Sequence, residues 1–397
     1  MLAAHYRTFF ESIGDALHVT AHSHHPWPDV TRAAHLVYWE DSARLTNRKW
    51  QEKVFGEVVP QAQGHVARLL DLPDPKLVAF APNTHEFVVR LYSCLDWSRP
   101  PRVLTTANEF HSFSRQTRRL EETGRLAVTR IPVEPYATFG ERFQHALTNR
   151  FDMVFLSHVF FDSGFVVEGL EALLSRASPD AIVAIDGYHA FLALPVELAR
   201  LGRQIFYVAG GYKYAQAGEG ACFMSTPVGS GLRPVYTGWF ADFGGLAGGQ
   251  DDTGERKGSP APSLVGYGDG AMRFWGSTFD ASGLYRFNAV MRWLLELGVG
   301  PREIHAHVAG LERRFLAGLA DAKLARLPLE SLTPPQGMPR GNFLTFELED
   351  AEGIERRLAA RGIIIDRRGT RLRFGFGVYH DAAFVDALLE RTRAALA

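Results

Sequence analysis

The chain has 397 residues, 46% of them hydrophobic, and its 43 Lys and Arg side chains are balanced by 44 Asp and Glu. That length can hold a large core and a second domain, while the charge balance argues against nucleic-acid and membrane partners. The two cysteines, Cys94 and Cys222, provide neither a disulfide framework nor a metal-ligand spacing. The sequence shows no apolar signal core and no bilayer-spanning run, so we expect a cytoplasmic protein that acts on a small molecule.

The N-terminal segment, residues 1–45, contains at 17–30 a short predicted strand and then a turn with His22, His24 and His25. Three histidines raise the question of a metal site, but no fourth ligand follows at a metal-finger spacing, and we predict no metal. Helical patterns then cover about residues 31–45 and 57–70.

A strand runs directly into a helix within residues 77–95, with Asn83 or Thr84 at the start of the helix. Such a junction is a good N-cap, and it is also an anion site because the first backbone N–H groups point outward. Thr84 therefore either caps the helix or binds a phosphate.

Strands and helices alternate over the following hundred residues or so. The predicted strands are residues 102–107, 126–131, 152–159, 182–185 and 205–209, and the predicted helices lie near 141–149 and 168–176. A repeated β-then-α pattern predicts a largely parallel sheet, and we assign residues 46–298 to this large α/β domain.

The most informative stretch covers residues 181–223. Asp186 ends a buried strand, His189 follows three positions later, and the next strand leads through two glycines to Tyr212 and Lys213. Open α/β sheets bind ligands at the carboxyl ends of their strands, although a turn aspartate is the alternative for Asp186. A lysine held between core strands loses solvation, which favours the neutral amine that bonds to an aldehyde; the alternative is a surface lysine in a glycine loop.

The last part of the chain predicts a smaller domain. Residues 237–272 are rich in Gly, Pro and Ser and predict a long loop, and helical patterns follow at 282–298 and 301–322. We assign residues 299–397 to a small α+β C-terminal domain, whose predicted strands and helices are 343–348, 351–361, 362–366, 370–376 and a final helix from about 380. In this domain, Arg371 or Arg373 either binds a substrate carboxylate through two hydrogen bonds or makes a surface ion pair.

Asp-x-x-His after one strand and Tyr-Lys after the next resemble the core of the class V, fold-type I family of pyridoxal-phosphate (PLP) enzymes. Within that family the phrase YVAGGYKYAQAGEG most resembles kynureninases. The resemblance covers nearly the whole chain and implies PLP as cofactor, the fold-type I PLP-dependent transferase fold, and a homodimer with composite active sites.

The resemblance also implies roles for individual residues. Lys213 carries the cofactor, Asp186 pairs with its pyridine nitrogen, and His189 bonds its phenolic oxygen. Phe110 stacks on the ring, with His111 as the competitor if the register differs by one. The remaining implied cofactor contacts are Asn83, Thr84, His85, Tyr212, Ser277 and Thr278, and the implied substrate contacts are Ser23, His24, Trp239 and Arg373.

Two positions depart from the family pattern. Asp162 stands where class V members often have Asn near the cofactor ring, and His380 replaces the Asn that usually follows Tyr379. Kynureninases often have one residue more between the arginine and the tyrosine, which keeps Arg371 in consideration beside Arg373.

Three chemistries of this family compete. Cysteine desulfurases need a mobile cysteine late in the chain, and no cysteine follows Cys222. The resemblance to kynureninases implies a hydrolase that cleaves the Cβ–Cγ bond of a 2-amino-4-oxo acid such as kynurenine or 3-hydroxykynurenine, giving alanine and an anthranilate, and this is the activity we expect. The runner-up is an aminotransferase or another PLP-dependent lyase. A separate hypothesis, outside these chemistries, is a cofactor-binding protein without turnover.

Overall fold

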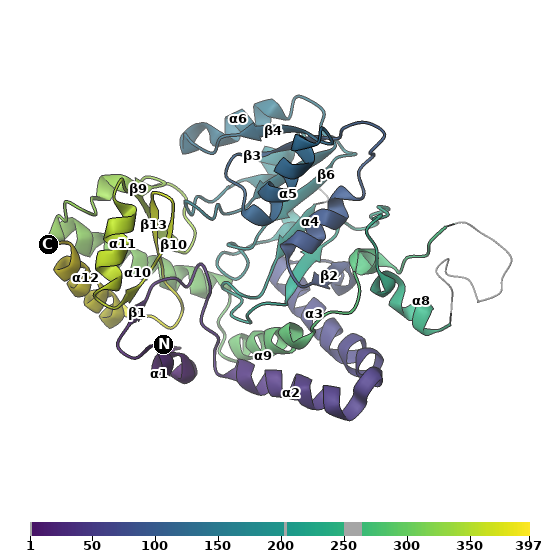
Figure 1. The fold of residues 1–397 in the computed structure, drawn as a ribbon, viewed down its shortest axis with the longest axis horizontal. Coiled ribbons are helices and arrows are strands. Elements are labelled where there is room, and N and C mark those ends of the chain that lie inside the picture. Colours follow the sequence, from purple (N-terminus) through teal and green to yellow (C-terminus); the bar gives the residue numbers. More distant parts are fainter. Residues whose placement is uncertain (1, 202–204, 250–263) are drawn as a thin grey trace.

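The computed structural model describes residues 2–201, 205–249 and 264–397. A large domain built on a seven-stranded sheet lies beside a smaller domain built on a four-stranded sheet (Figure 1). The mixed α/β fold with a mainly parallel large sheet and a smaller α+β domain confirms the predicted fold class.

The large sheet has the strand order β2-β8-β7-β6-β5-β3-β4. Its strands are β2 (Val78–Ala81), β3 (Arg102–Thr106), β4 (Ala127–Ile131), β5 (Met153–Ser157), β6 (Ile182–Asp186), β7 (Phe206–Ala209) and β8 (Cys222–Ser225). Only β8 runs antiparallel to its neighbours in this sheet. The central strands β5, β6 and β7 are buried along their whole length, which explains their continuous apolar sequences.

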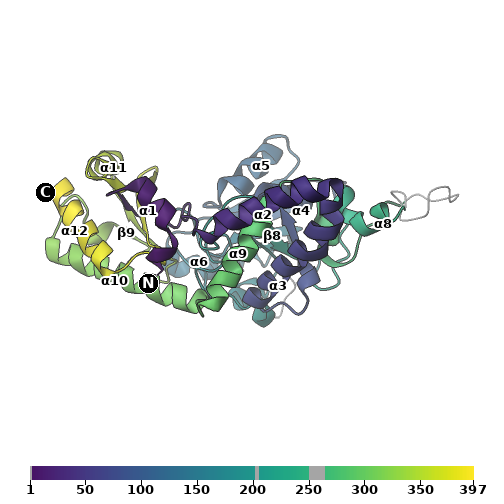
Figure 2. The same ribbon diagram turned by 90° about the horizontal axis from the view of Figure 1, so that it is seen from below.

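Helices cover this sheet and extend from it. They include α2 (Val30–Leu45), α3 (Val59–Leu70), α4 (Thr84–Tyr92), α5 (His111–Glu122), α6 (Phe139–Ala146), α7 (Leu170–Leu174) and α9 (Ser282–Glu296). Helices α2 and α9 pack together at the base of the large domain, as two perpendicular views show (Figures 1 and 2). The N-terminal segment therefore contributes a helix to the large domain.

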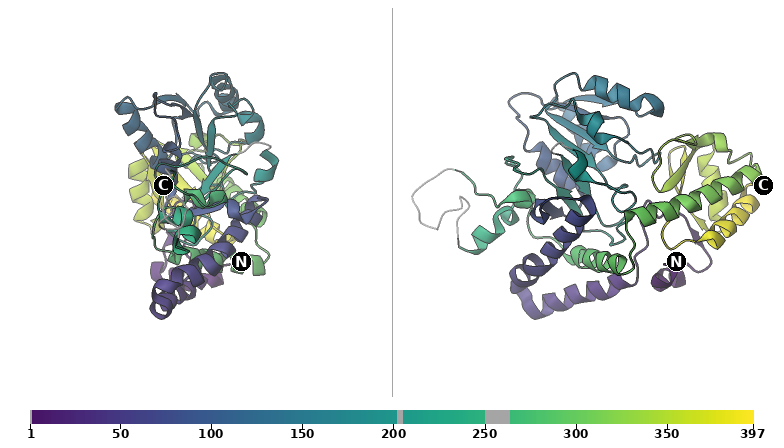
Figure 3. Two further views of the ribbon diagram at one scale, coloured as in Figure 1. Left: turned by 90° about the vertical axis from the view of Figure 1, so that its right-hand side faces the viewer. Right: turned by 180° about the vertical axis from the view of Figure 1, so that it is seen from behind.

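Helix α10 (Pro301–Ala322) joins the two domains and runs along the small one in the view from behind (Figure 3). Pro301 occupies its first turn, and Glu303 accepts a hydrogen bond from the Gly300 N–H at 2.9 Å, as a helix start requires. Its buried side chains recur on one face, at Ile304, Val308, Leu311, Phe315 and Leu319. This spacing explains why the sequence predicted the helix correctly.

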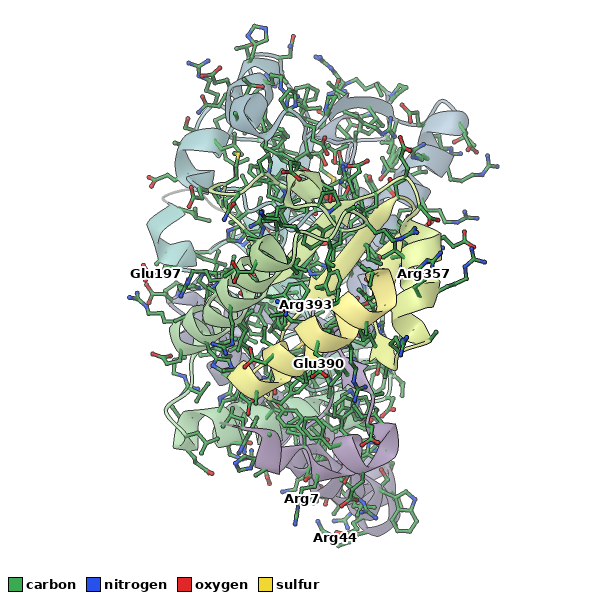
Figure 4. All side chains as sticks on the ribbon, turned by 90° about the vertical axis from the view of Figure 1, so that its left-hand side faces the viewer. Arg7, Arg44, Glu197, Arg357, Glu390 and Arg393 are labelled. Carbon is green, nitrogen blue, oxygen red and sulfur yellow. The ribbon has the colours of Figure 1, made fainter. Side chains whose placement is uncertain are left out.

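The small domain has the strand order β12-β13-β10-β9. Its elements are β9 (Leu332–Thr333), β10 (Phe343–Glu347), α11 (Ala351–Ala359), β12 (Asp366–Arg368), β13 (Arg371–Gly375) and α12 (Ala382–Leu396). The short strand β1 (Leu17–His18) pairs in parallel with β11 (Ile363–Ile364), so the chain start packs on this domain. Charged side chains such as Arg357 and Glu390 lie on the outer face of α11 and α12 (Figure 4).

Two local predictions need correction. Residues 50–56, for which no helix was predicted, belong to a π-helix, Trp50–Val58, ahead of α3. Within the predicted loop 237–272, short helical segments form at Trp239–Asp242, Phe243–Ala247 and Gly270–Phe274, while residues 250–263 lie outside the described part of the chain. In the first two segments Phe240 and Phe243 are buried, and this tertiary packing orders a sequence without local periodicity.

Candidate active site

The carboxyl ends of β6 and β7 and the turn into β8 form the centre of the site. Asp186 is the last residue of β6, and Lys213 lies in the turn between β7 and β8. Strands β6 and β7 are adjacent and parallel, with Asp186 in register with Val208, so their ends open at the same sheet edge. The topology thus brings together the two residues that the sequence singled out.

Lys213 is a buried amine whose hydrogen bonds go to carbonyl oxygens. Its Nζ donates to the backbone oxygen of His22 at 3.1 Å and lies 3.5 Å from that of Ser23. Burial, reinforced by the charge of Arg373 and opposed by Asp186, lowers the pKa of Lys213 to about 7. A large share of the amine is therefore neutral, and nucleophilic, near neutral pH.

Asp186 is also buried, and its Oδ1 accepts the Tyr188 N–H at 2.9 Å. Burial raises the pKa of Asp186 to about 6, while the Tyr188 hydrogen bond and the charge of Lys213 act against that rise. His189 is buried too, and its Nδ1 finds no hydrogen-bond partner in the described part of the protein. A buried polar atom without a partner is costly, so this nitrogen is suited to a ligand atom.

The two glycines before Tyr212 have a packing reason. A Cβ at Gly210 would lie 2.0 Å from the hydroxyl of Tyr188, so no larger residue fits there. The Tyr188 and Tyr212 rings lie 4.8 Å apart, and Tyr212 stacks on His24 at 5.1 Å. The turn that carries Lys213 is thus held between aromatic rings from the turn after β6 and from the N-terminal segment.

Arg373, on β13, forms the small-domain side of the site and is only 2% exposed. Its Nε donates to Asp366 Oδ1 at 2.9 Å, its Nη2 donates to Asp366 Oδ2, and its Nη1 donates to the backbone oxygen of Phe161. Asp366 also lies 3.4 Å from Nε2 of the buried His22, whose ring stacks on Phe343 at 4.4 Å. The predicted carboxylate-binding arginine is therefore already paired with a carboxylate of this chain.

Arg371, the competing arginine, faces three acidic side chains. It bonds to Asp162 at 2.8 Å, to Glu347 at 3.1 Å and to Glu134. These carboxylates hold the pKa of Arg371 above its ordinary value. Asp162, whose other oxygen is buried without a hydrogen-bond partner among the described residues, thus joins the arginine rather than standing free at the site.

The junction of β2 and α4 forms a separate wall. Asn83 caps α4 by accepting the Glu86 N–H at 3.2 Å, so Asn83 takes the capping role and Thr84 becomes the first helical residue. Thr84 is buried, with its Oγ1 3.8 Å from Cys222 Sγ, whereas the exposed His85 contacts Gln116 at 3.3 Å. Backbone N–H groups at this helix start remain suited to an anion.

Phe110 precedes α5 and is partly buried, with its ring 5.2 Å from Phe161 and 5.4 Å from His111. The preceding Glu109 is fully buried and receives hydrogen bonds from Thr106 at 2.7 Å and from the Ser157 hydroxyl at 2.6 Å. Burial raises the pKa of Glu109 to about 8. Glu109 therefore anchors the start of α5 at the sheet edge as a largely protonated acid.

Ser277, Thr278 and Trp239 are exposed and lie together, with Trp239 Nε1 donating to Thr278 Oγ1 at 3.3 Å. The adjacent Gly276 packs against Arg90 near the end of α4, because a Cβ there would lie 2.3 Å from Arg90 Nη2. Thr84 stands at the opposite end of the same helix. The Arg90 guanidinium beside Gly276 reaches back along α4, however, because its Nη2 donates to Glu86 in the first turn of the helix at 2.9 Å.

A family model described as Aminotransferase class-V matches residues 20–388. The chain belongs to this family. Its cofactor is accordingly pyridoxal phosphate. The residues fit this group: Lys213 supplies a poised amine, Asp186 a buried acid, and His189 Nδ1 an unfilled bonding position.

Solved structures share the fold of this class V protein. A lysine-to-alanine mutant of C-DES with glycine covalently linked to its PLP cofactor is 16% identical, with a TM-score of 0.79 over 98% of both chains. The cystine C-S lyase C-DES with its product cysteine persulfide gives 0.78 at 16% identity, over 97% of this chain and 99% of that one. A cysteine desulfurase from Thermococcus onnurineus NA1 gives 0.76 at 16% identity, over 96% and 95%. At such identities the likeness establishes the fold.

Among curated proteins, none matches this chain in sequence. No helix within the described residues is long and apolar enough to cross a membrane. The described residues also contain no cluster of three His, Cys, Asp or Glu side chains arranged to hold a metal ion.

Sequence reasoning missed the contributions of Asp366, Phe343 and Glu109, and it considered His22 only as a metal ligand. Asp366 had a readable signal, because a hairpin turning at Gly369 and Thr370 places Asp366 opposite Arg373, the register observed. The stacking of His22 on Phe343 joins segments hundreds of residues apart and left no local pattern.

Proposed function

We propose that this class V enzyme is a kynureninase-like hydrolase that cleaves the Cβ–Cγ bond of a 2-amino-4-oxo acid with an aryl group. Water supplies a hydroxyl to the acyl carbon and a proton to Cβ, so kynurenine would give anthranilate and alanine. The bound cofactor supplies an electron sink for the α-carbon.

The observation that carries this proposal is a cavity of about 1210 Å³ that borders the site at Phe161 and Asp162 and is lined by both aromatic and charged side chains, Arg115 and Arg119 among them. Its inner wall includes Glu109, His111, Phe161 and Asp162, and it continues past Tyr92 and Trp97. Phe161 links this cavity to the site centre, because its carbonyl accepts a hydrogen bond from Arg373. A cavity of this size, with aromatic side chains in part of its wall, has room for an aryl leaving group.

The cysteines argue against desulfurase chemistry. Burial raises the pKa of both Cys94 and Cys222 to about 12, so neither is a thiolate near neutral pH. Cys222 is fully buried on β8, where it cannot reach a substrate in the cavity.

Each protein residue has a defined task in the proposed reaction. Lys213 removes the α-proton when its amine is released, Asp186 holds the charge of the pyridine nitrogen, and Arg373 binds the substrate α-carboxylate. Phe110 provides the stacking ring, His189 a hydrogen bond, and Tyr212 with Thr84 the contacts of the phosphate. Ser23 and His24, from residues 1–45, border the substrate entrance, which the Lys213 contact to Ser23 and the His24 contact to Tyr212 support.

We also propose a homodimer with composite sites. Thr278 and Trp239 are exposed and in contact with each other, so they are available to a neighbour's site. Mixing a Lys213→Ala chain with a Thr278→Ala, Trp239→Ala chain should restore one intact site in each heterodimer and recover activity. If mixing restores no activity, each subunit has a self-contained site instead.

Incubation with kynurenine or 3-hydroxykynurenine in the absence of any keto acid tests the chemistry. We expect continuous release of alanine and the matching anthranilate, measured by chromatography and fluorescence. A reaction that stops after one turnover, and resumes only when a keto acid is added, would replace the hydrolase with an aminotransferase.

A further inference from the structure

Asp366 occupies the edge of Arg373 that a substrate carboxylate would need. The two residues face each other across the antiparallel pair β12 and β13, and Asp366 accepts hydrogen bonds from both Nε and Nη2. Nη1 already donates to the carbonyl of Phe161. Since a carboxylate binds a guanidinium most strongly through two parallel hydrogen bonds, the fork of Arg373 is occupied before any substrate arrives.

Asp366 has two other partners within reach, a neutral histidine and a cation. His22 Nε2 lies 3.4 Å from its Oδ1, and Arg368 Nη2 lies 3.8 Å from its Oδ2. The Asp366 side chain is 20% exposed, compared with 2% for Arg373, so the acid has room to turn while the arginine is held. Arg368 is 45% exposed and also acts on the pKa of Lys213, which places it at the same site.

We propose that Asp366 is a specificity-determining residue that competes with the substrate α-carboxylate for Arg373 and turns toward His22 and Arg368 when that carboxylate binds. This inference rests on the proposed function only for the substrate class, an α-amino acid. An amine that lacks a carboxylate cannot displace Asp366 from Arg373. Only a ligand that carries a carboxylate can therefore bind to this arginine.

The exchange conserves charge pairing throughout. In the empty site Arg373 is neutralised by Asp366, and in the occupied site it is neutralised by the substrate while Asp366 pairs with Arg368. Because neither buried charge is left without a partner, the exchange avoids the large cost of an unpaired buried ion. The affinity for a carboxylate ligand is nevertheless reduced by the fraction of time that Asp366 fills the fork.

Binding of L-alanine and ethylamine to the PLP-loaded protein tests this competition. Ethylamine shares the amine of alanine but lacks the carboxylate, and calorimetry measures both affinities without turnover. Asp366→Asn should bind L-alanine about tenfold more tightly than the unmodified protein, with ethylamine affinity changed less than about twofold. The matched control Glu352→Gln removes the same charge from an exposed position, 3.8 Å from Arg367, and should change neither affinity.

Arg368→Gln, an exposed substitution, supplies the second measurement and should weaken L-alanine binding several-fold because Asp366 loses an alternative partner. Unchanged or weaker L-alanine binding in Asp366→Asn, or no binding to either protein, would overturn the proposal and make Asp366 a fixed support for Arg373. Failure of the hydrolase proposal is distinguishable, because it appears as missing anthranilate and leaves these affinities unaffected.

Discussion

Lys213 and Arg373 are two buried cations of one site that differ in what pairs with them. Lys213, in the large domain, donates to carbonyl oxygens, and burial lowers its pKa to about 7. Arg373, in the small domain, forks onto Asp366, which opposes the pKa-lowering effect of burial. A buried cation with neutral acceptors becomes a base and nucleophile, whereas one with a carboxylate stays a charged binding group.

The difference shows that burial alone does not assign a role to a side chain. Both residues are less than a tenth exposed, and Asp186 influences Lys213 through its charge. The acid that most affects Arg373 lies directly opposite it in a hairpin. The placement of two carboxylates, Asp186 and Asp366, therefore distinguishes the environment of Lys213 from that of Arg373.

The largest effect on turnover is expected when Lys213 is replaced. Lys213→Ala should abolish covalent cofactor attachment and lower turnover at least about a thousandfold, because base and attachment point are lost together. Lys213→Arg is the matched control, since it keeps a cation but no nucleophilic amine. Borohydride reduction of the PLP-loaded protein and peptide mapping should label Lys213; labelling of a different lysine would contradict its assignment.

Removing the carboxylate that acts on Lys213 should have the next largest effect. Asp186→Asn retains an oxygen for the Tyr188 N–H, so we expect a folded protein with turnover reduced on the order of a hundredfold or more. Asp180→Asn, at a side chain that is 79% exposed, serves as the control. Steady-state rates near those of the unmodified protein would refute the pairing of Asp186 with the cofactor.

The lowered pKa of Lys213 predicts a specific pH dependence. Only the neutral amine bonds to PLP, so the rate of attachment to cofactor-free protein should rise about tenfold per pH unit below the pKa and level off above it. The midpoint should lie near the Lys213 pKa of about 7, and stopped-flow absorbance measures it. In Asp186→Asn the midpoint should move to lower pH, because Asp186 raises that pKa; a midpoint near the ordinary lysine value of 10.5 would contradict the burial argument.

The smallest effect is expected for the cysteines, the half-buried Cys94 and the buried Cys222, whose thiols stay neutral. A Cys94→Ala, Cys222→Ala protein should keep turnover within about twofold, because both thiols have a pKa raised to about 12. A loss of most activity, with thermal unfolding unchanged, would instead implicate a thiol in the reaction.

The sequence by itself determined the core of the fold and the centre of the site. Continuous apolar strands, the helix start at Asn83 and the glycines before Tyr212 are local signals, since each depends on neighbours within a few residues. Asp186 ends one strand and Lys213 follows the adjacent one, and the resemblance to class V PLP enzymes implied that the two would meet.

The tertiary structure alone decided the electrostatic partners. Asp366 on Arg373, Asp162 on Arg371 and His22 beside Phe343 depend on strand register and on contacts between distant segments, which leave no periodic pattern in the chain. The same holds for the neutral state of Lys213, because desolvation is a property of the assembled interior. The sequence therefore predicted which residues belong to the candidate site, and the packing of the two domains decides which of them remain charged.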